Sequence, residues 1–244
     1  MSRLKNALLL SLISLSLFSC SQKSINIEEA NTIINNIEHK LTDSTFKFPT
    51  KITINKLIKK NNSYIDKLSI RFSLDDLFLY YSNGFDEKFM NEHWRYVDKD
   101  ENKIYHLTSI TTNNKSIKYY EVFDFNKDDN FFTQNYSSLK DLIIDECSNF
   151  KETLDDCKTV SEDDDDFSKL KISSFNSKSI ELNASINLNS SKVVASQAFE
   201  NYLPKTSNIY KVNEDKEEKN FETKYYYNAV NITRPNIHNF ILKK

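Results

Sequence analysis

Histidine is the side chain best suited to acid–base catalysis and to binding transition metals. The chain has four, His39, His93, His106 and His238. No two of them are four residues apart, and none follows the spacing of a zinc site. Glycine-dependent motifs for nucleotide binding and hydrolysis need at least two glycines, whereas this chain of 244 residues has one. The sequence therefore predicts no enzyme, no metal ion and no cofactor. An enzyme whose catalytic residues meet only in the folded chain is the remaining alternative.

Acidic segments could instead hold calcium. The segments starting at Asp98 and Asp124 alternate acidic and amide residues as the first half of an EF-hand loop does. However, Lys103 and Asp129 stand where such a loop needs glycine. We therefore expect hairpin turns at both places, and a solvated loop at the acidic run 162–166. With glycine scarce, Asn and Asp must supply the turn positions that need a positive φ.

Cys147 and Cys157 form a pair that could become a disulfide in an oxidising compartment. Both lie in a segment with helical periodicity. Ten helical residues separate Cα atoms by about 15 Å, whereas a disulfide needs less than about 7 Å. We expect two half-buried thiols on one helix face, and a bridge across a break in the helix is the alternative.

The N-terminus has the organisation of a secretory signal. Arg3 and Lys5 form a positive segment, and an apolar stretch runs from Ala7 to Phe18. A membrane-spanning helix needs about 20 apolar residues, so this stretch is too short to cross a bilayer. It predicts export from the cytoplasm.

The sequence Leu17-Phe18-Ser19-Cys20 resembles the lipobox of bacterial lipoproteins, with Phe18 bulkier than the usual residue. The resemblance implies that residues 1–19 are a signal peptide. It also implies that the Cys20 thiol receives diacylglycerol and fatty acyl groups such as palmitate, which are the only groups we expect on the chain. Residues 20–25 then form the lipidated N-terminus and a short tether. The protein is expected at the cell membrane, lipid-anchored on the extracytoplasmic face.

Composition limits the partners and the number of domains. There are 33 basic and 35 acidic residues, so no electrostatic footprint for nucleic acid is expected. The 29 Asn and 29 Lys beside four Arg indicate an A/T-rich genome rather than a function. With 39% hydrophobic residues and no linker, residues 26–244 are expected to form a single α+β domain.

Periodicity predicts the order of elements in that domain. Apolar residues at helical spacing predict one helix from Asn26 to Leu41 and another over 138–160, with Leu142 on its apolar stripe. Alternating residues predict strands over 67–74, 77–81, 94–97, 104–111, 117–124, 180–188, around Tyr210 and over 221–232. Residues 191–203 are expected to form a short helix ended by Pro204.

This order resembles that of LolA/LppX-like lipid-binding lipoproteins, although no residue motif supports the likeness. It implies an α+β fold in which an antiparallel, curved, half-barrel-like sheet packs on an N-terminal and a central amphipathic helix. The activity stays unassigned, with an adhesin or envelope-interaction protein as the first interpretation. The alternative is a carrier of lipid or another hydrophobic ligand.

The carrier interpretation requires an apolar face larger than two helices can cover, because the remainder would then enclose a ligand. The expected partners are the membrane, through the anchor, and either a hydrophobic ligand or a surface protein. The residues expected to line an apolar cavity are Leu68, Ile70, Phe72, Ile180, Leu182, Ile186 and Leu188.

Overall fold

The computed structural model describes residues 22–60, 63–85, 88–126, 128–162, 171–176, 179–188, 191–213 and 216–243. Cys20 and residues 163–166 of the acidic run lie outside these ranges. Among the described residues, no helix combines the length and apolar character needed to cross a membrane. Part of the expected tether, Gln22–Ser24, is the edge strand β1, and Ile25 is buried.

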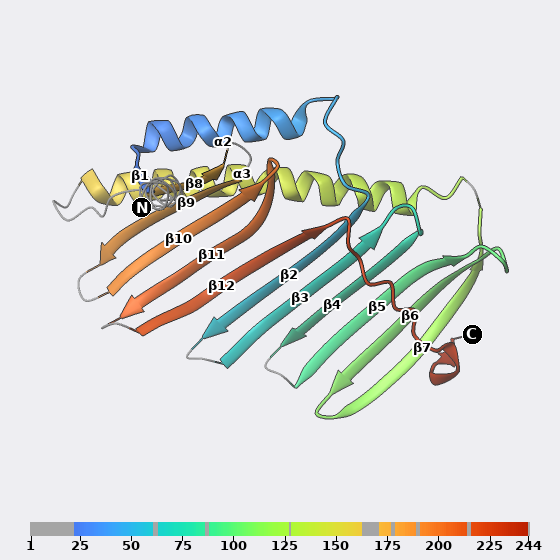
Figure 1. Cartoon of the computed structure of the whole chain (residues 1–244). Helices are drawn as coiled ribbons and strands as arrows, with labels where there is room; N and C mark the ends of the chain where they lie inside the picture. Colours follow the sequence, from blue (N-terminus) through green and yellow to red (C-terminus); the bar gives the residue numbers. More distant parts are fainter. Residues whose placement is uncertain are drawn as a thin grey trace, which may run out of the picture.

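One large open sheet dominates the fold (Figure 1). Its order among the described residues is β1-β8-β9-β10-β11-β12-β2-β3-β4-β5-β6-β7-β13. Neighbours are antiparallel, except that β13 is parallel to β7. The strands after β1 are β2 (Lys51–Lys60), β3 (Ser63–Ser73), β4 (Phe78–Phe85), β5 (Phe89–Asp98), β6 (Lys103–Thr112), β7 (Lys115–Asp124), β8 (Lys171–Asn176), β9 (Ser179–Leu188), β10 (Ser191–Glu200), β11 (Leu203–Asn213), β12 (Lys216–Tyr227) and β13 (Ile241–Leu242). The predicted mixture of an antiparallel sheet and two helices is confirmed.

Helix α2 (Ile27–Thr42) begins where the sequence predicts, because the Asn26 side chain accepts a hydrogen bond from the backbone N–H of Glu29 at 2.7 Å. Its buried stripe comprises Ala30, Ile34, Ile37 and Leu41.

Helix α3 (Phe131–Glu162) is longer than predicted. It starts at Phe131 rather than at 138. At this start the Asp129 carboxylate accepts a hydrogen bond from the Phe131 N–H at 2.8 Å. Leu142 lies at the margin of the packed face and is exposed, so its assignment to the buried stripe was wrong.

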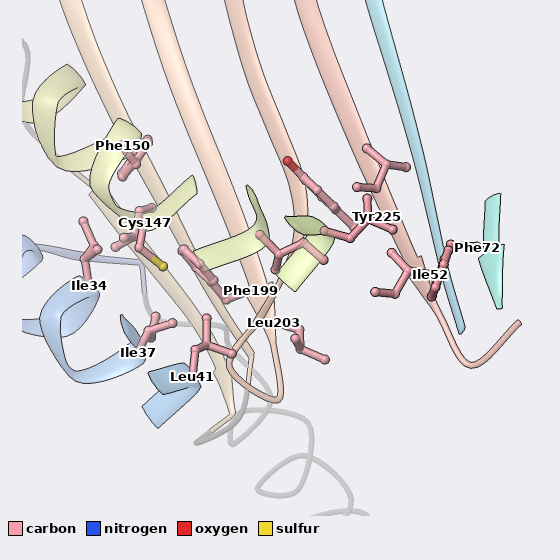
Figure 2. Close-up of a cluster of buried hydrophobic side chains, with 14 of the residues drawn as sticks. Ile34, Ile37, Leu41, Ile52, Phe72, Cys147, Phe150, Phe199, Leu203 and Tyr225 are labelled. Atoms are coloured by element: carbon pink, nitrogen blue, oxygen red, sulfur yellow. The ribbon is translucent and has the colours of Figure 1, made fainter. Parts of the chain in front are cut away.

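The main core lies between one face of the sheet and the two helices (Figure 2). Figure 2 shows side chains of α2 and α3 meeting side chains of the strands there, among them Leu41, Cys147 and Phe199. We call this face of the sheet the helix side and the opposite face the outer side. Helix α3 crosses the strands near one of their ends, and the opposite ends of β2–β7 extend beyond it (Figure 1).

The helix predicted over 191–203 is wrong, because β10 and β11 form a hairpin there. Asn201 and Tyr202 both adopt positive φ, as a two-residue hairpin turn requires. Pro204 lies within β11, opposite the irregularity at Ala198/Phe199, where a missing backbone N–H is tolerated.

Strand β2 was not predicted from the sequence, and the predicted end of β12 was too late. Strand β2 lies between β12 and β3, in the middle of the sheet. Strand β12 ends at Tyr227, and the chain from Asn228 onward leaves it. The residues that follow, to Lys243, cross the outer side of β4–β7 and include the short helix η1 (Ile237–Asn239).

Asparagine supplies most of the positive-φ positions, as expected. These residues are Asn102, Asn113, Asn114, Asn201 and Asn228. The Asp98 segment is the predicted hairpin turn, in which the Asp98 carboxylate accepts from the Asp100 N–H at 3.0 Å. The segment starting at Asp124 instead joins β7 to α3, so the expected second hairpin was wrong.

Candidate functional site

Strand register divides the side chains between the two faces of the sheet, because neighbours along a strand alternate. On the helix side, directly opposite residues form rows that cross the sheet. One row consists of Leu182, Gln197, Ser207, Thr223, Lys56, Leu68, Asn83, Asn91, Ile110 and Ile117. It runs from the part of the sheet beneath α3 to the ends of the strands that the helices leave uncovered (Figure 1).

Apolar side chains continue on the helix side beyond the helices. We call them the distal strip, which comprises Leu68, Phe85, Phe89, Ile110 and Ile117. Phe85 and Ile117 are 58% and 67% exposed, and the other three are half-buried. Exposed apolar residues are ordinary when scattered, but a contiguous group on an inward face indicates a binding surface.

A polar band separates the distal strip from the start of α3. His93 and His106 lie diagonally across β5 and β6, with ring centroids 5.9 Å apart. His93 Nδ1 is 3.1 Å from the Thr108 hydroxyl, and His106 Nδ1 is 3.5 Å from the Glu121 carboxylate. The sequence contained a signal for this pairing, because the hairpin turn at 98–102 already sets the register of both strands.

Arg95 connects this polar band to α3. Its guanidinium lies 3.8 Å from the centroid of the Phe131 ring and 3.4 Å from the Asp129 carboxylate. Burial lowers the pKa of His93, and burial together with the neighbouring His93 and Arg95 lowers that of His106. Both imidazoles are therefore neutral at pH 7, the form that exchanges protons or binds metal. No group of three metal-binding side chains occurs among the described residues.

The outer side holds a second cluster, built on Phe78, Tyr96 and Leu107. The C-terminal segment covers it, because Ile232 and Phe240 pack against it. The strand aromatics Tyr80, Trp94, Tyr96, Tyr105 and Tyr120 lie in this cluster. Trp94 and Tyr96 contact Phe240 and Arg234 of the protein's own C-terminal segment.

The residues expected to line an apolar cavity all belong to β3 and β9, which have four strands between them. Phe72 and Leu182 are fully buried in the main core, and Phe72 stacks on Tyr136. Ile70 and Ile180 pack at its margin, and Leu68 belongs to the distal strip. The side chains of Ile186 and Leu188 lie outside the described residues.

A pocket of about 390 Å³ lies beside the β10–β11 turn. Ile180 and Phe199 line it together with Glu200 and Lys205, whose charged ends are 2.9 Å apart. Glu181 also lines the pocket, and these charged side chains make it less suited to an apolar ligand than the distal strip.

Cys147 is fully buried as a free thiol, and burial raises its pKa to about 12. The α3 backbone continues unbroken past Cys157, whose side chain lies outside the described residues. The geometry therefore follows the helical expectation, with no break that would allow a bridge between the two. A thiol with such a high pKa is not a nucleophile.

Comparison of the chain with models of known protein families, with curated proteins and with solved structures gives no significant match. The arrangement of the described side chains is therefore the basis for the functional argument.

Proposed function

We propose that the protein is a membrane-anchored extracytoplasmic lipoprotein that holds an acyl chain of a lipid on the helix side of a half-barrel-like sheet. The distal strip is the single observation that carries this proposal. Its apolar side chains face the same way as the core, yet neither helix covers them. Burying apolar surface contributes about 25 cal/mol per Å², so an apolar occupant gains from lying there.

The length of the distal strip fits one acyl chain. From Leu68 on β3 to Ile117 on β7 there are four steps between neighbouring strands. At about 4.8 Å a step, the strip is about 19 Å long. One leaflet occupies half of a hydrocarbon core about 30 Å thick, so its chains span roughly 15 Å. A single chain can therefore lie along most of the strip.

The lipobox-like segment supports the anchoring part of the proposal. One acyl group holds a protein only marginally at a membrane, whereas two or more hold it durably. The formal net charge of −2 provides no attraction to anionic lipid. Anchoring through Cys20 would keep the distal strip beside a source of lipid.

Native mass spectrometry of the full chain, extracted from bacterial membranes, tests acyl binding. We expect an added mass of several hundred daltons that disappears on denaturation, unlike the covalent anchor. We expect a double variant, with Phe85→Asn and Ile117→Asn in the same chain, to lose this added mass. Tyr226→Asn is the matched control, because Tyr226 is an exposed aromatic on the outer side. A bare chain mass in the wild type contradicts the proposal.

The second candidate function is an adhesin or envelope-interaction protein, and the filled core favours it. Beneath the helices Ile34, Phe72 and Ile143 are fully buried, so protein side chains surround them on all sides. The distal strip would then contact a protein. A bare chain mass, combined with loss of a co-purifying envelope protein in the variant that carries both Phe85→Asn and Ile117→Asn, would support this function instead.

A further inference from the structure

The row that ends at the distal strip starts with polar residues beneath α3. We call Gln197, Ser207, Thr223 and Lys56 the covered row, which crosses β10, β11, β12 and β2. Lys56 stands directly opposite Leu68, the first residue of the distal strip. The covered row is thus continuous with the strip proposed to hold an acyl chain.

Several donors of this region lack partners. Gln197 and Thr223 are only 1% and 3% exposed, and neither Gln197 Nε2 nor Thr223 Oγ1 has a hydrogen-bond partner among the described residues. Tyr225, two residues along β12, also lacks a well-formed hydrogen bond, although its hydroxyl faces the Glu146 carboxyl. Buried polar groups are nearly always paired, and an unpaired one destabilises the fold. Three such groups within three adjacent strands, Gln197 on β10 and Thr223 and Tyr225 on β12, indicate a function that outweighs this loss.

The charges around these donors are compatible with a ligand oxygen that accepts hydrogen bonds. The titratable groups that interact with Glu146 include Tyr225, Tyr227, Cys147, Lys56 and Asp145. Burial raises the pKa of Glu146, while Tyr225 and Lys56 partly counteract that rise. A protonated Glu146 would be a further donor rather than a repelling anion. Lys56 is half-buried, with its ammonium 4.7 Å from the centroid of the Phe221 ring.

We propose that Gln197, Thr223 and Lys56 bind the carbonyl or carboxylate oxygen at the polar end of the acyl ligand, whose chain lies on the distal strip. This inference rests on the proposed function and names the ligand class as a fatty acid or an acyl ester. An amide N–H and a hydroxyl both donate to such an oxygen, and the Lys56 ammonium favours a negative one. The order along the row places the polar end beneath α3 and the apolar chain outside it.

The test uses apolar replacements of similar size, Gln197→Leu and Thr223→Val, in the full chain kept soluble in amphipol. Displacement of a dansylated fatty acid by oleate, or by methyl oleate, gives the affinity. Because each variant removes an unpaired buried donor, we expect the melting temperature to stay the same or rise. We expect the affinity for oleate to fall roughly tenfold per lost hydrogen bond. Thr53→Val is the matched control, because Thr53 is buried on the outer side.

The outcomes separate the two proposals. If neither probe binds the wild type, acyl binding fails and this inference with it. If oleate binds and both variants match the wild type or the Thr53→Val control, the inference is overturned while acyl binding stands. If the variants lower the affinity for both oleate and methyl oleate, the acyl carbonyl oxygen is the bound group. If they lower the affinity for oleate, and methyl oleate does not bind the wild type, the carboxylate is the bound group.

Discussion

Phe240 packs edge-on against Trp94, with ring centroids 6.1 Å apart and the ring planes at 83°. Trp94 belongs to β5, whereas Phe240 follows η1 in the C-terminal segment that crosses the outer side. Arg234 fixes the same segment, because it donates to the Val97 carbonyl at 3.2 Å and lies over the Tyr96 ring. The C-terminus therefore acts as a cover for the aromatic outer side.

Trp94 is the only tryptophan of the chain, so its fluorescence reports whether this cover is in place. In Phe240→Ala we expect red-shifted emission, because water reaches the indole. We also expect the free energy of unfolding to fall by about 1–3 kcal/mol, less than for a fully buried Phe, since Phe240 is half-buried. Fluorescence with urea denaturation measures both quantities. An unchanged emission maximum would show that Phe240 does not shield Trp94.

The outer cover illustrates what sequence patterns miss. The hairpins β4–β7 were predictable because polar and apolar residues alternate and Asn-rich turns separate them. The segment after Asn228 has no period, and its packing depends on Phe240 and Arg234 meeting rings that are distant in sequence. The apolar residues of β10 suggested a helix for a different reason, because a short apolar run does not distinguish a helix from a strand.

The helical spacing of Cys147 and Cys157 predicts two free thiols. In the native protein we expect Cys147 to be inert to a thiol reagent, because burial raises its pKa to about 12 and its side chain is inaccessible. After unfolding without reductant, the reagent should titrate two thiols, with Cys20 modified. A count of zero would show a disulfide and contradict the unbroken helix.

The histidine pair makes stability depend on pH. The pKa of His93 and of His106 is lowered in the folded state, so the unfolded chain, with a His pKa near 6.5, binds more protons. Stability is therefore complete above about pH 6.5 and falls as the pH drops toward the folded pKa values. The raised pKa of Glu146 acts in the opposite direction, with stability lost as the pH rises through its folded value.

Comparison of the wild type with a His93→Gln, His106→Gln variant isolates the histidine contribution. Urea denaturation at pH 7.5 and 5.5 should show a smaller loss of stability for the variant in acid. Glu146 is unchanged in both proteins, so its effect cancels. Equal losses would show that burial of the two imidazoles does not affect their titration.

The candidate site was predictable only in part. The sequence placed Leu68, Ile70 and Phe72 on one face of a strand, and the structure confirms that alternation. The sequence could not show how far the helices extend over the sheet. This extent determines that Phe72 belongs to the core, whereas Leu68 lies at the edge of the region that the helices cover. The covered row was also out of reach, since Gln197 lies in a strand that was expected to be helical and Lys56 lies in one that was missed.

If Cys20 carries the anchor, a single substitution there should abolish both lipid attachment and membrane association. In Cys20→Ser the thiol that accepts diacylglycerol is gone, and the remaining apolar stretch is too short to span a bilayer. We expect the variant to incorporate no radiolabelled palmitate and to move from the membrane to the soluble fraction. Cys147→Ser is the matched control, because it removes a thiol from α3 and should leave the label in place. If Cys20→Ser stays at the membrane without the label, a different contact holds the protein there, and the distal strip is the next surface to test.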